Sequence, residues 1–149
     1  MAIPASRAVG PERHVDGFPV CYAHSPDGAL FAAVAFWAAA TAAPPASVYR
    51  HLAADTPTRA QALASSSGDN SRLSDSGQVS LAGFTFASYT PGLASVAIVL
   101  QTTQGAMVAV TCTMVWQDGD WRYEIPPGGT PPASQVTGID GYTAWGATS

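Results

Sequence analysis

Residues 108–125 read VAVTCTMVWQDGDWRYEI, and this stretch decides the fold of the chain. Every second position up to Trp116 is apolar, which is the pattern of a strand with one buried face. A second alternating run begins at Trp121, directly after Asp118 and Gly119. Because Asp-Gly between two alternating runs is a strong hairpin signal, we predict two antiparallel strands joined by this turn. Both indoles are then expected to close the same end of the core.

Two further strands are expected upstream in the same antiparallel sheet. The first begins at Val79, and its apolar residues change phase near Gly83, which predicts a β-bulge at that point. The second covers residues 93–102. Pro126 and Pro127 end the last strand, because proline cannot donate a hydrogen bond to a neighbouring strand.

The first half of the chain predicts helices. A helix begins at SPDG (25–28), where serine suits the N-cap and proline the first helical position, and it runs to about Ala42. Its apolar residues, Trp37 among them, lie almost all round the helix, so we expect it to be buried on most sides. Two short helices are expected near residues 46–54 and 57–65, each introduced by a proline.

Helices followed by antiparallel strands are the element order of an α+β fold. The predicted architecture is a cone-shaped roll like that of the nuclear transport factor and ketosteroid isomerase superfamily. In it, a long N-terminal helix and short helices pack on a curved antiparallel sheet of about four strands. We expect residues 1–13 to form a flexible arm and residues 14–149 to form one domain, with a mobile loop at residues 65–78.

The composition excludes some classes of partner. The 149 residues contain 11% charged residues, and the six basic residues, all of them arginines, leave a net charge of −4. Such a chain offers no basic patch for nucleic acid. The strongly apolar run at residues 29–43 is shorter than the ~20 residues that a membrane helix needs, so a buried helix is the better interpretation.

No motif for catalysis or metal binding is recognised. The inward strand positions are apolar, whereas general acid–base catalysis needs a carboxylate or imidazole there. The three histidines, His14, His24 and His51, lack the spacing of metal ligands. The DGD sequence at residues 118–120 supplies too few oxygens for Ca²⁺. The sequence therefore predicts no enzyme activity, no cofactor and no metal.

Two questions about side chains stay open at this level. Cys21 and Cys112 could form one long-range disulfide outside the cytoplasm, or they could remain two small buried side chains. If the fold instead held an apolar ligand pocket, Tyr22, His24 and Tyr123 would be the polar groups at its base.

Five stretches together resemble an actinobacterial domain found in proteins that are encoded within integrative and conjugative elements. They are AIPASRAVGP (2–11), VDGFPVCYAHSPDGALFAAVAFWAAAT (15–41), VSLAGFTFASYTPGLASVAIVL (79–100), VWQDGDWRYEIPPGGTPP (115–132) and VTGIDGYTAW (136–145). The most specific motifs in them are Ser-Tyr-Thr-Pro, Trp-x-x-Gly-Asp-Trp-Arg and Asp-Gly-Tyr. The cysteines are not part of the resemblance.

The resemblance implies a non-enzymatic scaffold domain of a type IV secretion-like DNA-transfer apparatus. Members of the family usually carry one membrane helix upstream, so the domain is expected on the extracytoplasmic face of the membrane, behind an anchor that precedes Met1. Its implied partners are protein subunits of the transfer complex and further copies of itself. The alternative is a cone-fold protein or enzyme that binds a small apolar molecule in a pocket.

Overall fold

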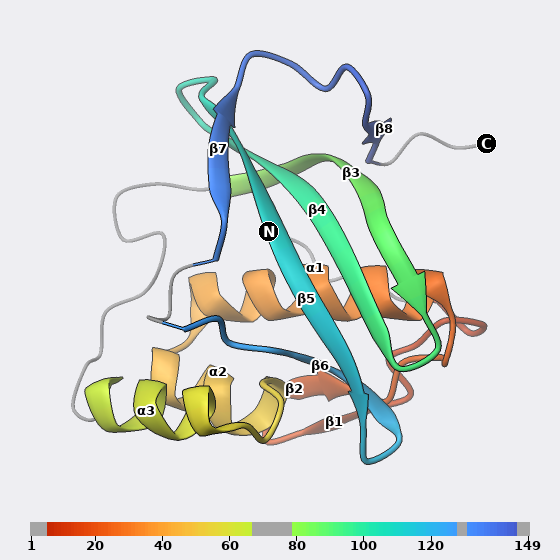
Figure 1. Ribbon diagram of the computed structural model, residues 1–149, viewed down its shortest axis with the longest axis vertical. Coiled ribbons are helices and arrows are strands. Elements are labelled where there is room, and N and C mark those ends of the chain that lie inside the picture. The colour runs from red at the N-terminus through yellow and green to blue at the C-terminus, as the bar shows by residue number, and fades with distance from the viewer. Residues whose placement is uncertain (1–5, 67–78, 128–130, 146–149) are drawn as a thin grey trace.

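The computed structural model describes residues 6–66, 79–127 and 131–145, so most of the loop predicted at residues 65–78 lies outside the described residues (Figure 1). The elements in chain order are β1 (Arg13–Val15), β2 (Phe18–Val20), α1 (Pro26–Ala42), α2 (Pro45–Leu52), α3 (Pro57–Ser66), β3 (Val79–Thr90), β4 (Leu93–Thr102), β5 (Met107–Gln117), β6 (Asp120–Tyr123), β7 (Ala133–Val136) and β8 (Thr143–Ala144).

A six-stranded antiparallel sheet dominates the structure. Its strand order is β6-β5-β4-β3-β8, and β7 also pairs with β5. β6 pairs with the last residues of β5, and β7 pairs with the first residues of β5, so the two short strands share one edge of the same long strand (Figure 1). β1 and β2 form a separate two-stranded ribbon.

The predicted fold class, a cone-shaped roll with a long N-terminal helix on about four strands, is wrong. The main sheet has six strands, and the three helices contain 17, 8 and 10 residues. β7 and β8 were missed because they contain four and two residues that are mostly exposed, and such strands have no alternating apolar pattern. Because the prediction lacked these two strands, it gave a sheet of about four strands instead of six.

The predicted hairpin at residues 108–125 is confirmed. β5 and β6 pair in antiparallel register, and Trp116 lies opposite Trp121. Asp118 has φ 55° and Gly119 has φ 79°, the positive values that a tight hairpin turn with Asp-Gly at its centre requires. The turn residues therefore perform the role that the sequence pattern predicted for them.

Helix α1 lies behind the sheet and forms the other layer of the core (Figure 1). Its predicted start is confirmed, since the Ser25 side chain accepts a hydrogen bond of 3.1 Å from the Gly28 amide. Side chains of α1, β4, β5 and β6 fill the interface between the layers. The fully buried side chains in this interface include Val34, Val96, Ile98, Cys112 and Met114, each at most 1% exposed.

The C-terminal segment returns to the free edge of β3 at Gly83. The register of β3 shifts between Leu81 and Gly83, which confirms the predicted bulge. A Cβ atom on Gly83 would lie 2.8 Å from the Thr143 carbonyl oxygen, so only glycine permits β8 to pair this closely. The Trp145 backbone amide donates a hydrogen bond of 3.0 Å to the Ala82 carbonyl oxygen, and the Trp145 ring packs edge to face on Phe84.

The buried carboxylate of Asp120 ties the N-terminal segment to the start of β6. Its Oδ2 accepts a hydrogen bond of 2.8 Å from the Cys21 amide. Its Oδ1 accepts bonds of 2.9 Å from the Tyr22 amide and 2.8 Å from the Trp121 amide. Asp120 is 6% exposed, and backbone amides occupy both of its oxygens. The neighbouring Arg122 side chain donates to the carbonyl oxygens of Gln117 and His51.

Asp120→Asn is expected to lower the free energy of unfolding by about 2–3 kcal/mol. The amide oxygen can keep the two bonds made by Oδ1, but the new NH₂ group faces the Cys21 amide, and two donors cannot pair. The matched control is Asp118→Asn at the exposed turn, where asparagine tolerates a positive φ and a change within about 0.5 kcal/mol is expected. Urea unfolding followed by tryptophan fluorescence measures both. Equal stability of the two variants would contradict the role of the clamp.

Gly83→Ala is expected to destabilise the fold by about 1–3 kcal/mol, because the added methyl group forces the Thr143 carbonyl away from β3. Gly92→Ala is the control, since a Cβ atom at that position would meet nothing within 4 Å. Urea unfolding gives the stability, and amide hydrogen exchange at residues 143–145 tests whether the last strand has detached. Unchanged protection of these amides in Gly83→Ala would show that the bulge tolerates a side chain.

Candidate functional site

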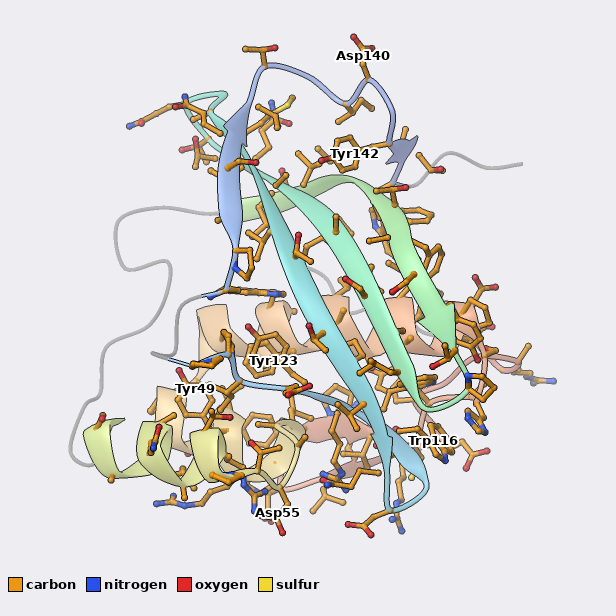
Figure 2. All side chains as sticks on the ribbon, in the orientation of Figure 1. Tyr49, Asp55, Trp116, Tyr123, Asp140 and Tyr142 are labelled. Atoms are coloured by element: carbon orange, nitrogen blue, oxygen red, sulfur yellow. The ribbon has the colours of Figure 1, made fainter. Side chains whose placement is uncertain are left out.

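The three polar side chains proposed for an apolar pocket do not converge. Tyr22 is buried beneath the N-terminal segment, His24 lies exposed at the end of the sheet, and Tyr123 is buried in the core. Figure 2 shows Tyr123 inside the fold and Trp116, the partner of His24, at the hairpin end of β5. Of the three, only Tyr22 lines either of the two cavities described below, so they form no common site there.

Tyr123 and Trp37 belong to the packed centre of the core. The Tyr123 ring stacks on Phe36 with centroids 4.0 Å apart, and the Trp37 indole donates a hydrogen bond of 3.0 Å to the Cys112 Sγ. Burial raises the pKa of the Cys112 thiol to about 12, and burial also raises the pKa of the Tyr123 hydroxyl above its ordinary value. Both groups are therefore protonated at neutral pH, and their positions are those of structural side chains.

The two cysteines are free thiols in the structure. Cys112 is 0% exposed, and its sulfur contacts the Trp37 indole. Cys21 is half-buried beside the N-terminal segment, with a φ of 70°. Of the two alternatives left open by the sequence, the structure has the unpaired form, although only Cys112 is fully buried.

An aromatic cluster formed by His24, Trp116, Trp121 and Tyr89 closes the hairpin end of the sheet. The His24 ring stacks on Trp116 with centroids 4.0 Å apart and planes inclined by 6°. Trp121 meets Trp116 edge to face at 5.4 Å, and Tyr89 packs on Trp121 at 6.0 Å. The expected closure of one core end by both indoles is thus confirmed, and His24 extends the cluster to the surface.

Hydrogen bonds hold the rings of the aromatic cluster in place. The Trp121 Nε1 donates a bond of 2.9 Å to the Ala23 carbonyl oxygen. The His24 Nε2 donates to the Pro91 carbonyl oxygen in the turn between β3 and β4. Because these bonds join the segment before α1 to β6 and to the turn between β3 and β4, the exposed ring of His24 is held in a defined orientation.

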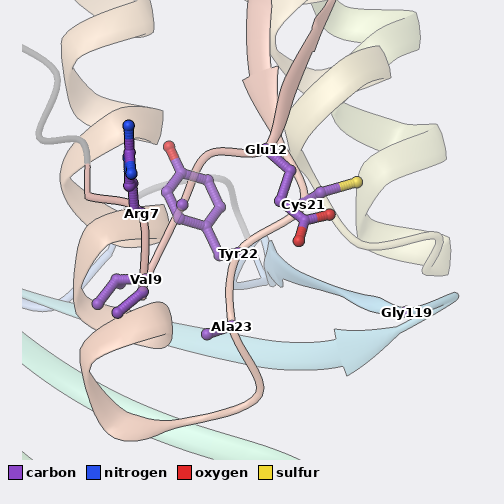
Figure 3. A pocket seen from close by; sticks show the side chains of 9 residues that line it. Arg7, Val9, Glu12, Cys21, Tyr22, Ala23 and Gly119 are labelled. Carbon is purple, nitrogen blue, oxygen red and sulfur yellow. The ribbon is translucent and has the colours of Figure 1, made fainter.

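A second surface feature, the N-terminal cavity, lies beneath residues 6–13, half of which are exposed. It has a volume of about 240 Å³. It is lined by Arg7, Ala8, Val9, Gly10, Glu12, Cys21, Tyr22, Ala23 and Gly119 (Figure 3). The amide of Ala23 donates a bond of 2.8 Å to the Val9 carbonyl, and Ser6 and Gly10 bond each other's backbone. Residues 6–13, assigned to a flexible arm from sequence, thus form one wall of this cavity.

A much smaller cavity of about 10 Å³ is also lined by Tyr22, together with residues of β2, α1, α2 and β6. Asp120, Ala32 and Ala35 are among the residues that line it. The Tyr22 hydroxyl has no hydrogen-bond partner within the described residues. Burial, and secondarily the Asp120 carboxylate, raise the pKa of this hydroxyl above its ordinary value. A cavity of this size holds at most about one water molecule.

Sequence reasoning missed Arg7 and Glu12 as members of a site. Both lie in a stretch without periodicity, and neither belongs to a known motif. They come to the cavity only because backbone bonds fold residues 6–12 against Cys21 and Ala23. The stretch was expected to form a flexible arm, and no local pattern indicated what it would pack against.

Within residues 6–66, 79–127 and 131–145, no group of three or more His, Cys, Asp or Glu side chains is placed to hold a metal ion. Among the same residues, none of the helices has the length and apolar character needed to span a bilayer.

A family model described as "Domain of unknown function (DUF8175)" matches residues 1–144. The chain belongs to this family. No curated protein and no solved structure matches it. Since the description of DUF8175 names no activity, functional inference for this member depends on the aromatic cluster and the N-terminal cavity.

In this DUF8175 chain, a water-soluble thiol reagent at about pH 8 is expected to modify Cys21 and to leave Cys112 unmodified in the native state. Because the pKa of Cys112 rises from 9.0 to about 12, its reactive thiolate is depleted about a thousandfold, and burial blocks access as well. Mass spectrometry counts the modified thiols. Cys21→Ser is the control, which should take up reagent only in denaturant. Rapid native modification of Cys21→Ser would show that the core around Cys112 opens.

Proposed function

We propose that this domain is a non-enzymatic scaffold of a conjugative, type IV secretion-like DNA-transfer apparatus. It acts through protein–protein contacts on the extracytoplasmic face of the membrane, held there by an anchor outside this chain. Two kinds of support exist for this proposal. The sequence motifs resemble those of domains encoded in integrative and conjugative elements, and the aromatic cluster presents a surface suited to binding another protein.

The aromatic cluster is the observation that carries the proposal. Tyrosine and tryptophan are enriched among the residues that dominate binding energy at protein interfaces. Here His24 is exposed and Trp116 is half-buried, their rings stack on each other, and the His24 ring also donates a hydrogen bond to the Pro91 carbonyl oxygen. Rings that are fixed before binding lose little conformational entropy when a partner covers them, which favours their use as anchors.

The outer face of β4 and β5 beside the aromatic cluster carries no charged side chain, and Arg122 of β6 lies opposite Val115 next to it. The outward side chains that are at least partly exposed on β4 and β5 include Leu93, Ser95, Thr111, Thr113 and Val115, whereas Ala97, Val99 and Ala109 in the same phase are buried. Leu93 is 47% exposed and pairs with Val115 across the two strands. Charged residues are depleted at the centres of protein interfaces, so this composition also favours a protein partner.

The alternative function, binding of an apolar molecule between helix and sheet, has weaker support. The layer between α1 and the sheet is filled by side chains such as Ile98 and Met114, each at most 1% exposed. Asp120 is a buried carboxylate, but three backbone amides occupy its oxygens, so it is engaged in holding the fold. A ligand in the core would have to displace packed side chains, which costs stability.

The proposal is tested by the double variant His24→Ala/Leu93→Ser, introduced into donor cells in place of the native chain. Loss of an aromatic anchor and an exposed leucine is expected to reduce partner affinity at least about tenfold, and the transfer frequency should fall with it. The matched control, His14→Ala/Val15→Ser, changes the same kinds of exposed residue on β1. Transfer frequency, cellular protein level and thermal stability are measured for both variants.

Two results would overturn the proposal. Wild-type transfer by a stable His24→Ala/Leu93→Ser protein would exclude the aromatic cluster as the docking surface. Unchanged transfer after deletion of the whole gene would exclude a role in the apparatus. A selective loss in the His24→Ala/Leu93→Ser cells, with wild-type transfer in the control, is the expected result.

A further inference from the structure

We propose that the N-terminal cavity binds a small zwitterion with the chemistry of a free α-amino acid. The Arg7 guanidinium would bind its carboxylate, and the Glu12 carboxylate would bind its ammonium group. This site is separate from the aromatic cluster and does not depend on the scaffold function. It rests on the charges, the free hydrogen-bonding groups and the size of the cavity.

The lining of the cavity contains one positively charged and one negatively charged side chain. Arg7 and Glu12 both line it, and neither makes an ion pair or a side-chain hydrogen bond with another described residue. Figure 3 shows Arg7 on one side of the Tyr22 ring and Glu12 on the other, next to Cys21. Two opposite charges that face one cavity without pairing can each hold the complementary charge of one small molecule.

The backbone of the cavity walls is largely occupied by internal bonds. The Cys21 and Tyr22 amides donate to Asp120, the Gly10 amide donates to Ser6, and the Ala23 amide donates to the Val9 carbonyl. The polar groups available to a ligand are therefore chiefly the side chains of Arg7 and Glu12 and the Cys21 thiol. Ala8, Val9 and Ala23 add small apolar surface between them.

Size and charge narrow the class of ligand. A volume of about 240 Å³ is smaller than the ~300–1,000 Å³ of sites for drug-sized molecules. A nucleotide or a phosphorylated ligand carries negative charge only, and here the lining contains Arg7 as its one basic side chain together with the negatively charged Glu12, which would repel a phosphate. A small molecule that carries both charges uses both groups.

The walls of the cavity are held before any ligand arrives. Asp120 fixes residues 21 and 22 from below, and the bridge between Ser6 and Gly10 closes the opposite wall. Gly10 has φ 111°, and a Cβ atom there would lie 2.7 Å from the Cys21 carbonyl oxygen, so the two walls meet backbone to backbone. A pre-formed site lowers the entropic cost of binding a small ligand.

Binding is tested with the whole chain and pools of free α-amino acids at millimolar concentration. The half-buried Cys21 thiol lines the cavity, so a bound amino acid is expected to slow its modification by a maleimide reagent and to shift its NMR signals. The amino acid that protects best is then compared with its N-acetylated and its amidated forms. Each blocked form removes one charge-assisted hydrogen bond and should bind at least about tenfold more weakly than the free amino acid.

Charge-neutralising variants assign each contact. Arg7→Gln should weaken binding of the free amino acid about tenfold and remove its advantage over the amidated form. Glu12→Gln should weaken binding of the free amino acid to the same degree and remove its advantage over the acetylated form. Arg13→Gln is the control, since Arg13 is exposed on β1 and does not line the cavity. Arg7 and Glu12 are themselves exposed, so these variants leave the core intact.

Two outcomes overturn the proposal. The first is the absence of both protection and chemical-shift changes with every pool. The second is binding that is insensitive to blocking of the charged groups, or that Arg7→Gln weakens no more than Arg13→Gln does. The proposal is supported if Arg7→Gln no longer distinguishes the free amino acid from its amidated form and Glu12→Gln no longer distinguishes it from its acetylated form.

Discussion

The buried carboxylate of Asp120 joins the beginning of the chain to the end of the main hairpin, and both surface features depend on that junction. Its three backbone donors lie at residues 21, 22 and 121, so residues about a hundred positions apart are held together. A buried carboxylate is tolerated because these amides replace the water that it loses on folding. With residues 21 and 22 held, Cys21 faces the N-terminal cavity, and Ala23 is in place to accept the bond from the Trp121 indole.

Both candidate surfaces lie at the periphery of a closed core. The layer between α1 and the sheet is filled, and its polar side chains, Cys112 and Tyr123, have pKa values raised by burial. The aromatic cluster and the N-terminal cavity share the short segment from Cys21 to His24, which contributes to each. The two-layer body holds both surface features, and the segment that precedes α1 contributes side chains to each of them.

Local patterns predicted much of the secondary structure and little of the candidate sites. The hairpin at residues 108–125, the bulge at Gly83 and the start of α1 follow from alternation, phase and capping, and each is found in the structure. The edge strands β7 and β8 could not be predicted, because a short edge strand with few buried side chains needs no apolar pattern. The fold class failed for that reason. The cavity residues Arg7 and Glu12 were missed because their proximity to Cys21 arises from long-range backbone bonds.

The sequence by itself determined where the main strands and helices begin and end, because turn chemistry, capping and hydrophobic period act between residues a few positions apart. It also determined the low content of charged residues and the net charge of −4. The tertiary structure alone decided that Asp120 is buried as a clamp while Asp118, two residues away, is exposed. In the sequence the two aspartates are equivalent members of one turn. Only the approach of the Cys21 and Tyr22 amides distinguishes them, since a carboxylate can leave water only where donors from elsewhere in the fold replace it.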